Sequence, residues 1–361
     1  MTDRVRLRRP PCRGPGVFST GMLAVLGCAG SRDPDPDRDG IADDCVIPEH
    51  GLPADVFCTG LQLDRDPGQY VERVAPYEPG VTLWSDGAEK QRYLYLPPGT
   101  EIDTTDFDAW QFPEGTKAWK EFRFDGRLVE TRLFWKRAPS EWASGTYIWD
   151  ASGSDATLDT SRMPTIVGDD YEIPTAKDCG KCHHGGADKL LGIEAVALAL
   201  PGALGVTLQV LRDDGRLSWA PSSPQARLPE DSTGRAAAAL GYLHANCGMP
   251  CHSSRGLGDE TQLLLRIRAD EIWQLPQHGA PVSDATEAEA YAATVGVEPT
   301  TASVAQRFPG ALRVTPGVHE SSLLWLMTDR RDDYAMPPLV SHKVDPAGTK
   351  ALAAWIDAMS P

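Results

Sequence analysis

The middle of this 361-residue chain contains Trp119-Lys-Glu-Phe-Arg-Phe-Asp-Gly-Arg-Leu-Val-Glu-Thr-Arg-Leu-Phe-Trp135, and this stretch decides the fold. Two runs rich in apolar and aromatic residues, 119–124 and 127–135, flank Asp125-Gly126. A two-residue Asp-Gly connector is typical of a type I′ turn between antiparallel strands. The second run alternates between two faces of a strand, with Val129, Thr131, Leu133 and Trp135 on one and Leu128, Glu130, Arg132 and Phe134 on the other. We therefore predict a hairpin in a half-buried antiparallel sheet.

The strand pattern extends to both sides of this hairpin, over residues 70–155. Tyr93-Leu-Tyr-Leu96 precedes a Pro-Pro-Gly turn and is typical of a further strand. We predict a β-domain here, folded as an antiparallel β-sandwich or barrel. Its tryptophans could line a ligand groove, although core packing is their more common use: Trp84, Trp110, Trp119, Trp135, Trp142 and Trp149.

From Tyr171 onward the pattern becomes helical. Thr175 followed by Asp178 indicates a helix N-cap, and residues 190–200 form an apolar run that ends at Pro201-Gly202. We predict a helical region over 156–229 and a second one over 230–361. In the second region, Asp231-Ser-Thr233 is expected to cap one helix and Asp345-Pro346 to begin another. The last helix has one apolar stripe, formed by Leu352, Trp355, Ile356 and Met359.

Each helical region contains a Cys-Cys-His cluster, Cys179-Gly-Lys-Cys182-His183 and Cys247-Gly-Met-Pro-Cys251-His252. C-x-x-C-H is the attachment signature of c-type haem, in which two thiols bond to the porphyrin vinyl groups and the histidine binds the iron. We predict covalent haem at both clusters, with His183 and His252 as axial ligands. The second cluster has one additional residue, so its loop must bulge for both thiols to reach the porphyrin.

A sixth ligand is predicted for one of these haems. Tyr334-Ala-Met336-Pro-Pro338 holds a methionine on an extended loop, and Met336 offers a soft thioether sulfur to iron. No equivalent ligand is evident for the haem at His183. The candidates there are His184, His244, Met163 and Met249.

The N-terminus has the pattern of an export signal. Five arginines between Arg4 and Arg13 precede an apolar run over 17–26, and Val25-Leu-Gly-Cys28 is typical of a lipoprotein cleavage site. The run is too short to span a bilayer, which takes about 20 residues. We predict that residues 1–27 are removed and that Cys28 is lipidated. The protein would then be anchored to a membrane in the periplasm or at the outer membrane.

Residues 28–69 form an Asp/Pro/Gly-rich linker in this interpretation. Its carboxylates at Asp35, Asp37, Asp39 and Asp43 resemble the calcium loops of thrombospondin type 3 repeats, and oxygen ligands suit calcium. A solvated tether is the alternative. Cys45 and Cys58 could form a disulfide, because disulfides persist in an exported compartment.

The chain is acidic, with 35 basic and 51 acidic residues and a formal net charge of -16. Such a charge argues against nucleic acid or anionic lipid as a partner and suits a basic redox partner protein. The sequence contains no phosphate-binding loop or dinucleotide fingerprint in the required context. Catalysis by side chains is therefore a weaker expectation than electron transfer.

These features together resemble known haem proteins. Residues 230–361 are similar to a class I cytochrome c domain, and the whole chain resembles a family of bacterial dihaem c-type cytochrome-like proteins with an N-terminal β-domain. The segments that carry this resemblance are Leu83-Trp-Ser-Asp-Gly-Ala-Glu-Lys90, Val129-Glu-Thr-Arg-Leu133, Ile173-Pro-Thr-Ala-Lys-Asp-Cys179 and Tyr242-Leu-His-Ala-Asn-Cys247. The resemblance implies an α+β multidomain fold, a β-sandwich or barrel followed by all-α cytochrome c-like domains, and electron transfer in the periplasm or at the outer membrane.

Three other functions remain open. The haems could serve an oxidoreductase whose β-domain binds a substrate. The four thiols and two imidazoles could instead hold zinc in two partial sets, although the export signal and the Met336 loop argue against this. A haem-free exported binding module would carry both cysteine pairs as disulfides.

Overall fold

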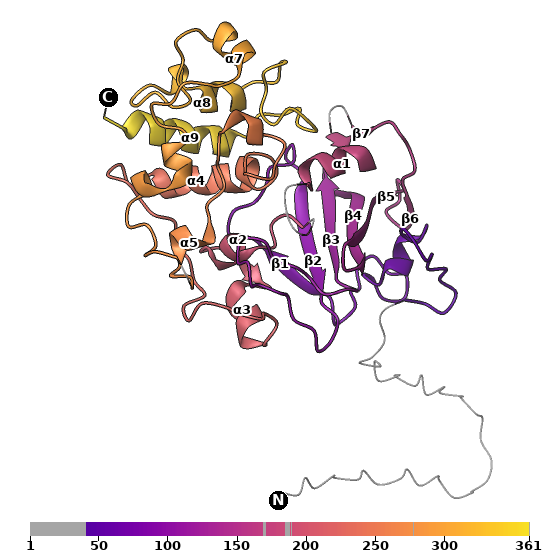
Figure 1. Cartoon of the computed structure of the whole chain (residues 1–361). Coiled ribbons are helices and arrows are strands. Elements are labelled where there is room, and N and C mark those ends of the chain that lie inside the picture. Colours follow the sequence, from indigo (N-terminus) through magenta and orange to yellow (C-terminus); the bar gives the residue numbers. More distant parts are fainter. Residues whose placement is uncertain (1–40, 169–170, 185–187, 189, 277, 361) are drawn as a thin grey trace, which may run out of the picture. The chain divides into compact units, whose positions relative to one another are not determined.

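The computed structural model describes residues 41–168, 171–184, 188, 190–276 and 278–360. Its centre is a seven-stranded antiparallel sheet in the order β6-β5-β4-β3-β2-β1-β9 (Figure 1). Strands β7 and β8 form a separate two-stranded sheet. The strands are β1 (Ala75–Glu78), β2 (Glu89–Tyr95), β3 (Lys117–Phe124), β4 (Arg127–Ala138), β5 (Glu141–Trp149), β6 (Ala156–Leu158), β7 (Thr165–Val167), β8 (Tyr171–Ile173) and β9 (Leu204–Gly205).

The central hairpin is confirmed. Strands β3 and β4 pair from Phe124 and Arg127 outward. Asp125 and Gly126 both have positive φ values, 49° and 72°, as a type I′ turn requires. Glycine adopts this conformation at no steric cost, and aspartate is among the few other residues that tolerate it.

The predicted sandwich or barrel is wrong, because the main sheet is a single open layer that ends at β6 and β9. One face packs on residues that precede the first strand, including Leu52, Val56 and Leu61. Part of the expected linker over 28–69 therefore belongs to the core. The predicted disulfide between Cys45 and Cys58 is confirmed and ties this segment together, with 5.4 Å between the Cα atoms.

The predicted all-α cytochrome c domain is also wrong. The helices are α1 (Ala176–Cys182), α2 (Ala195–Ala199), α3 (Leu208–Asp213), α4 (Ala236–Leu243), α5 (Ala269–Ile272), α6 (Glu289–Ala292), α7 (Ala302–Arg307), α8 (Leu323–Thr328) and α9 (Pro346–Ala358). Among the described residues the longest is α9, with 13 residues. Within this part of the chain, no helix is both long and apolar enough to cross a membrane.

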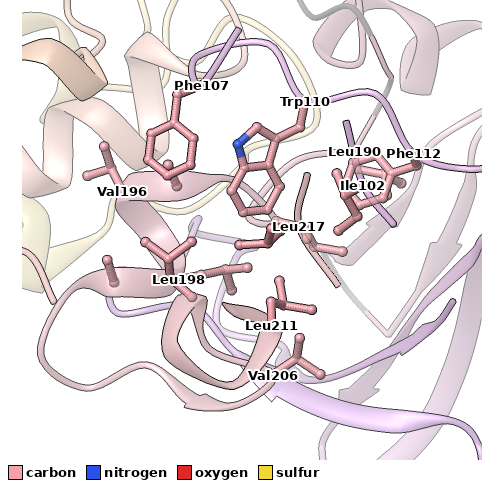
Figure 2. Close-up of a cluster of buried hydrophobic side chains, with 14 of the residues drawn as sticks. Ile102, Phe107, Trp110, Phe112, Leu190, Val196, Leu198, Val206, Leu211 and Leu217 are labelled. Atoms are coloured by element: carbon pink, nitrogen blue, oxygen red, sulfur yellow. The ribbon is translucent and has the colours of Figure 1, made fainter. Parts of the chain in front are cut away.

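The reason is that many apolar residues from the helical regions pack against the sheet rather than against other helices. One core cluster joins Tyr77, Leu94 and Phe134 of the strands to Leu198 of α2 and Leu208 of α3. Figure 2 shows the centre of this cluster, where Trp110 and Leu217 lie among Val196, Leu198, Val206 and Leu211. Sheet and helices thus share a core, and residues Asp39–Pro361 form one compact unit.

Two helix starts differ from expectation. The run over 190–200 is helical only in α2, because the Glu194 carboxylate caps that helix through the N–H groups of Val196 and Ala197. Helix α4 begins without a side-chain cap from its N-cap residue. Asp231, the expected cap, instead accepts a hydrogen bond from Trp355 Nε1 at 2.9 Å.

The final helix is confirmed. Asp345 caps α9, Pro346 begins it, and Leu352 and Trp355 on its stripe are wholly buried. Helix α9 packs closely on α4, since a Cβ atom at Gly348 would lie 2.1 Å from the Tyr242 ring. This packing, which forms a second core cluster, fixes the helix that leads into the second cysteine cluster.

Candidate cofactor site

A cavity of about 400 Å³ lies against one face of the sheet. Both cysteine clusters line it, together with the methionine predicted as an axial ligand. These residues come from three distant parts of the chain: Cys179, Cys182, His183, Cys247, Cys251, His252 and Met336. The sequence analysis predicted each of them but did not predict that they share one cavity.

The first cluster lies on the short helix α1, as predicted. Thr175 caps this helix by accepting a hydrogen bond from the Asp178 N–H, and its hydroxyl donates to the Asp178 carboxylate at 2.7 Å. His183 follows the last turn and donates its backbone N–H to the Cys179 carbonyl at 3.1 Å. Its ring stacks on Phe134 of β4 with 4.4 Å between the centroids. The sheet therefore orients the first imidazole.

The second cluster lies where α4 widens into a π-helical turn, His244–Gly248. The Met249 N–H donates to the His244 carbonyl at 2.8 Å, and the His252 N–H donates to the Cys247 carbonyl at 2.7 Å. Both bonds link residues five apart, the spacing of a π-helix. This wider turn contains Cys247 and leads into the rest of the second cluster.

Gly258 leaves room for the second imidazole, His252. A Cβ atom at Gly258 would lie 2.7 Å from His252 Nδ1, which is too close for a side chain to fit without movement. The Thr261 hydroxyl lies 3.4 Å from the same nitrogen. Burial lowers the pKa of His252. Burial thus favours the neutral form of the ring, which is the form that binds metals.

Met336 is held by its backbone, which donates a hydrogen bond to the Met327 carbonyl at 2.7 Å. Its side chain lines the same cavity as His252. The flanking peptide to Pro337 is cis. The loop thus places Met336 at the cavity that both cysteine clusters line.

The other candidate axial ligands differ in their suitability. His244 is engaged at both ring nitrogens, because Nε2 lies 3.2 Å from Glu194 Oε1 and Nδ1 accepts the Ile267 N–H at 3.0 Å. His184 is exposed, and Met163 is 72% exposed. Met249 lines the cavity and also a smaller adjoining one that contains His183. Of these candidates, Met249 alone lines both cavities together with His183.

The thiols of the two clusters meet. A hydrogen bond with Cys251 lowers the pKa of Cys182 to about 7 and raises that of Cys251. Burial raises the pKa of Cys247 to about 12 and also raises that of Cys179. All four are free thiols. Two porphyrins attached to these sulfurs would therefore be close neighbours.

The sequence analysis missed the sheet wall of the cavity. Strands β2, β3 and β4 present four cations to it, Lys90, Arg92, Lys120 and Arg132. Lysines and arginines at alternate positions along the predicted strands could have indicated this wall. Periodicity alone, however, assigns such residues to solvent, whereas here a second layer of the protein covers that face.

The remaining predicted sites lie elsewhere. Cys28 and the carboxylates at Asp35, Asp37 and Asp39 are outside the described residues, and Asp43 is exposed. A separate surface group consists of His319, Glu320 and Asp357, whose possible ligand atoms lie within 4.8 Å of one another. His319 Nδ1 is 2.8 Å from the Asp357 carboxylate, so an ordinary hydrogen bond explains this group.

The cavity residues fit a haem group chemically. They supply thiols for attachment, two imidazoles and a thioether for iron, and aromatic and aliphatic side chains such as Phe134 and Leu190 for the porphyrin faces. The Nε of Arg331, which also lines the cavity, is buried and has no hydrogen-bond partner among the described residues. An anionic occupant would satisfy such a group. No protein-family model, curated protein or solved structure matches this chain.

Proposed function

We propose that this chain is an exported dihaem c-type protein that transfers electrons between redox partners. One haem would be attached at Cys179 and Cys182 and the other at Cys247 and Cys251. The observation that carries the proposal is that two Cys-Cys-His clusters and Met336, far apart in sequence, line one cavity. Proteins seldom gather four free thiols and two imidazoles around an apolar space without a cofactor or metal.

In this proposal each thiol S–H adds across a vinyl double bond of the porphyrin, forming a thioether with no other product. Bound haem supplies one-electron chemistry. His183, stacked on Phe134, and His252, beside Thr261, would hold the irons. Met336 as a further ligand would raise the reduction potential of the iron that it binds.

The proposal includes the location and the partners. Removal of residues 1–27 and lipidation of Cys28 would place the protein in the periplasm or at the outer membrane. Its acidic surface would meet a basic redox protein. Replacing Cys28 with Ala should release the protein from the membrane fraction, and continued membrane attachment would contradict the lipid anchor.

Covalent haem per chain is the decisive measurement. The full chain is expressed with a c-type haem maturation system, denatured and analysed by pyridine haemochrome and intact mass. We expect two haems in the wild type and one in each of two variants, Cys179→Ala/Cys182→Ala and Cys247→Ala/Cys251→Ala. The matched control, Cys45→Ala/Cys58→Ala, removes the disulfide and should keep two haems. A wild type without haem, in a host that matures another cytochrome, would overturn the proposal.

A second candidate is a zinc site, favoured by the hydrogen bond between Cys182 and Cys251. Cysteines from two separate parts of a chain are typical of a tetrahedral thiolate site. Metal analysis of the same preparations separates the two functions. Stoichiometric zinc with no covalent haem would establish this alternative.

A further inference from the structure

The cavity face of the sheet carries a row of cations in register. Arg92 of β2 lies directly opposite Lys120 of β3, and Lys120 lies directly opposite Arg132 of β4. Lys90 is two residues along β2 on the same face, opposite Phe122. All of these residues line the cavity. Like charges directly opposite each other across strands are destabilising, so this row requires compensation.

Only the two arginines are compensated by carboxylates. Arg92 pairs with Glu78 at 3.0 Å, and Arg132 pairs with Glu130 at 2.6 Å. The ammonium of Lys120 donates to the Leu191 carbonyl at 3.0 Å, and that of Lys90 donates to the Leu83 carbonyl. Neither lysine forms an ion pair with a carboxylate of the described residues.

The acidic groups at the cavity are otherwise engaged. Each has its own partner in the protein, except Glu260, which is exposed. Asp178 pairs with Lys181 at 3.0 Å, Glu172 with His342 at 2.7 Å and Glu194 with His244 at 3.2 Å, while Asp86 accepts the backbone N–H groups of His342 and Lys343. Among the described residues, each of the two lysines is therefore left with a backbone carbonyl and no carboxylate.

The pKa values of Lys120 and Lys90 agree with this geometry. Burial, with repulsion from Arg92 and Arg132, lowers the pKa of Lys120 to about 7. Burial and the same arginines, with Lys120, also lower the pKa of Lys90 well below its usual value. A carboxylate in the cavity would favour the charged form of both lysines.

We propose that Lys90 and Lys120 form a carboxylate-binding wall and that the groups they bind are haem propionates. The identity of the ligand rests on the proposed function, since propionates are the only charged substituents of the porphyrin. A free dicarboxylate would suit the same two ammonium groups. The test therefore distinguishes haem propionates from a free dicarboxylate. Glutamate and aspartate side chains of the described residues do not fill this role, as shown above.

The test compares two porphyrins on the full chain, prepared without haem maturation and with reduced thiols. One is iron protoporphyrin IX, with two free propionates, and the other is its dimethyl ester. Soret titration should show that the wild type binds the diacid at least tenfold more tightly. Lys90→Met/Lys120→Met should remove this preference. The matched control Arg123→Met removes a cation from β3 that does not line the cavity and should preserve it.

Each outcome decides the inference. Equal binding of both porphyrins by the wild type, binding of neither, or a preference that survives the double substitution would overturn it. Glutarate binding that depends on both lysines, without a preference among porphyrins, would assign the wall to a free dicarboxylate. Covalent haem counting in matured protein is a separate measurement. A chain that carries two haems but shows no preference loses this inference alone, whereas a chain without covalent haem loses the proposed function.

Discussion

On one face of the β3–β4 hairpin, Trp119 and Leu133 are wholly buried against the N-terminal segment. On the other face, Lys120 and Arg132 alternate with them along the same strands and line the cavity. Both faces contain charged groups. On the packed face the Glu121 carboxylate accepts hydrogen bonds from Tyr70 and Gln62, each at 2.8 Å. On the cavity face Lys120 has only a backbone carbonyl.

We propose that this difference separates a structural buried charge from one that binds a ligand. A buried charge is tolerated when the protein itself supplies hydrogen-bonding and ionic partners. Glu121 meets this condition through neutral donors, whereas Lys120 lies opposite Arg92 and Arg132 on the neighbouring strands. Lys120 lies on the face where the thiols and imidazoles gather. The following predictions test whether the two faces really differ in this way.

The largest expected effect is on the packed face. Trp119→Ala should lower the free energy of unfolding by about 3 to 5 kcal/mol, because it removes a wholly buried indole and leaves a cavity. It also removes the hydrogen bond from Trp119 Nε1 to Thr59 at 3.2 Å. Urea denaturation of the haem-free chain measures the change.

Phe134→Ala is the matched substitution on the cavity face. Its ring borders an existing space, so truncation should lower the free energy of unfolding by less than half as much. Equal losses at the two positions would show that the haem-free cavity is closed in solution, and the contrast between the faces would then be lost.

The next effect has the opposite sign. Lys120→Met should raise the free energy of unfolding of the haem-free chain by about 2 kcal/mol at pH 7, because it removes an uncompensated buried ammonium. The pKa of Lys120 is about 7 when folded, and lysine in an unfolded chain has a pKa near 10.4. The unfolded chain therefore binds more protons between these values, so the wild type gains stability as the pH rises.

The advantage of Lys120→Met should consequently shrink from pH 7 to pH 10. Denaturant melts of both proteins across this range measure it. A destabilised variant, or an advantage independent of pH, would mean that Lys120 already has an anionic partner in the haem-free protein.

The hairpin and the last helix could be predicted because their signals are local. The Asp125-Gly126 turn and the Asp345-Pro346 start each depend on the conformational preferences of adjacent residues. The architecture could not be predicted in this way. Whether an apolar helix such as α2 packs on another helix or on a sheet is decided by long-range contacts, which leave no periodic signal in its own sequence.

The candidate site, too, could be predicted from the sequence only in part. The identities of Cys179, Cys182 and His183 follow from motif spacing, but the meeting of Cys182 with Cys251 depends on how α1 and α4 are placed. The lysine wall was missed for a related reason. Its register across β2, β3 and β4 is visible only when the strands are paired.

The comparison of faces extends to the two imidazoles. His183 leans on Phe134 of the sheet, whereas His252 depends on a loop that includes Gly258. Gly258→Ala should displace the His252 ring and lower the free energy of unfolding by about 1.5 kcal/mol. In matured protein it should also change the spectrum of one haem while both remain covalently attached. Gly180→Ala, in the first motif, is the control, since a Cβ atom there meets nothing within 4 Å. Identical spectra for Gly258→Ala and the wild type would contradict this role of the glycine.

The smallest expected effect concerns the start of α1, which carries the first cluster to the cavity face. Thr175→Ala removes the side-chain oxygen that caps the helix and should lower the free energy of unfolding by about 1 kcal/mol. Thr233→Ala is the matched control, because Thr233 was expected to help cap α4 but accepts only the Arg235 N–H, outside that helix. Thr233→Ala should lower the free energy of unfolding by less than half as much as Thr175→Ala. If the two losses were equal, the cap on α1 would contribute nothing specific, and the packing of His183 on Phe134 would suffice to hold the first cluster against the sheet.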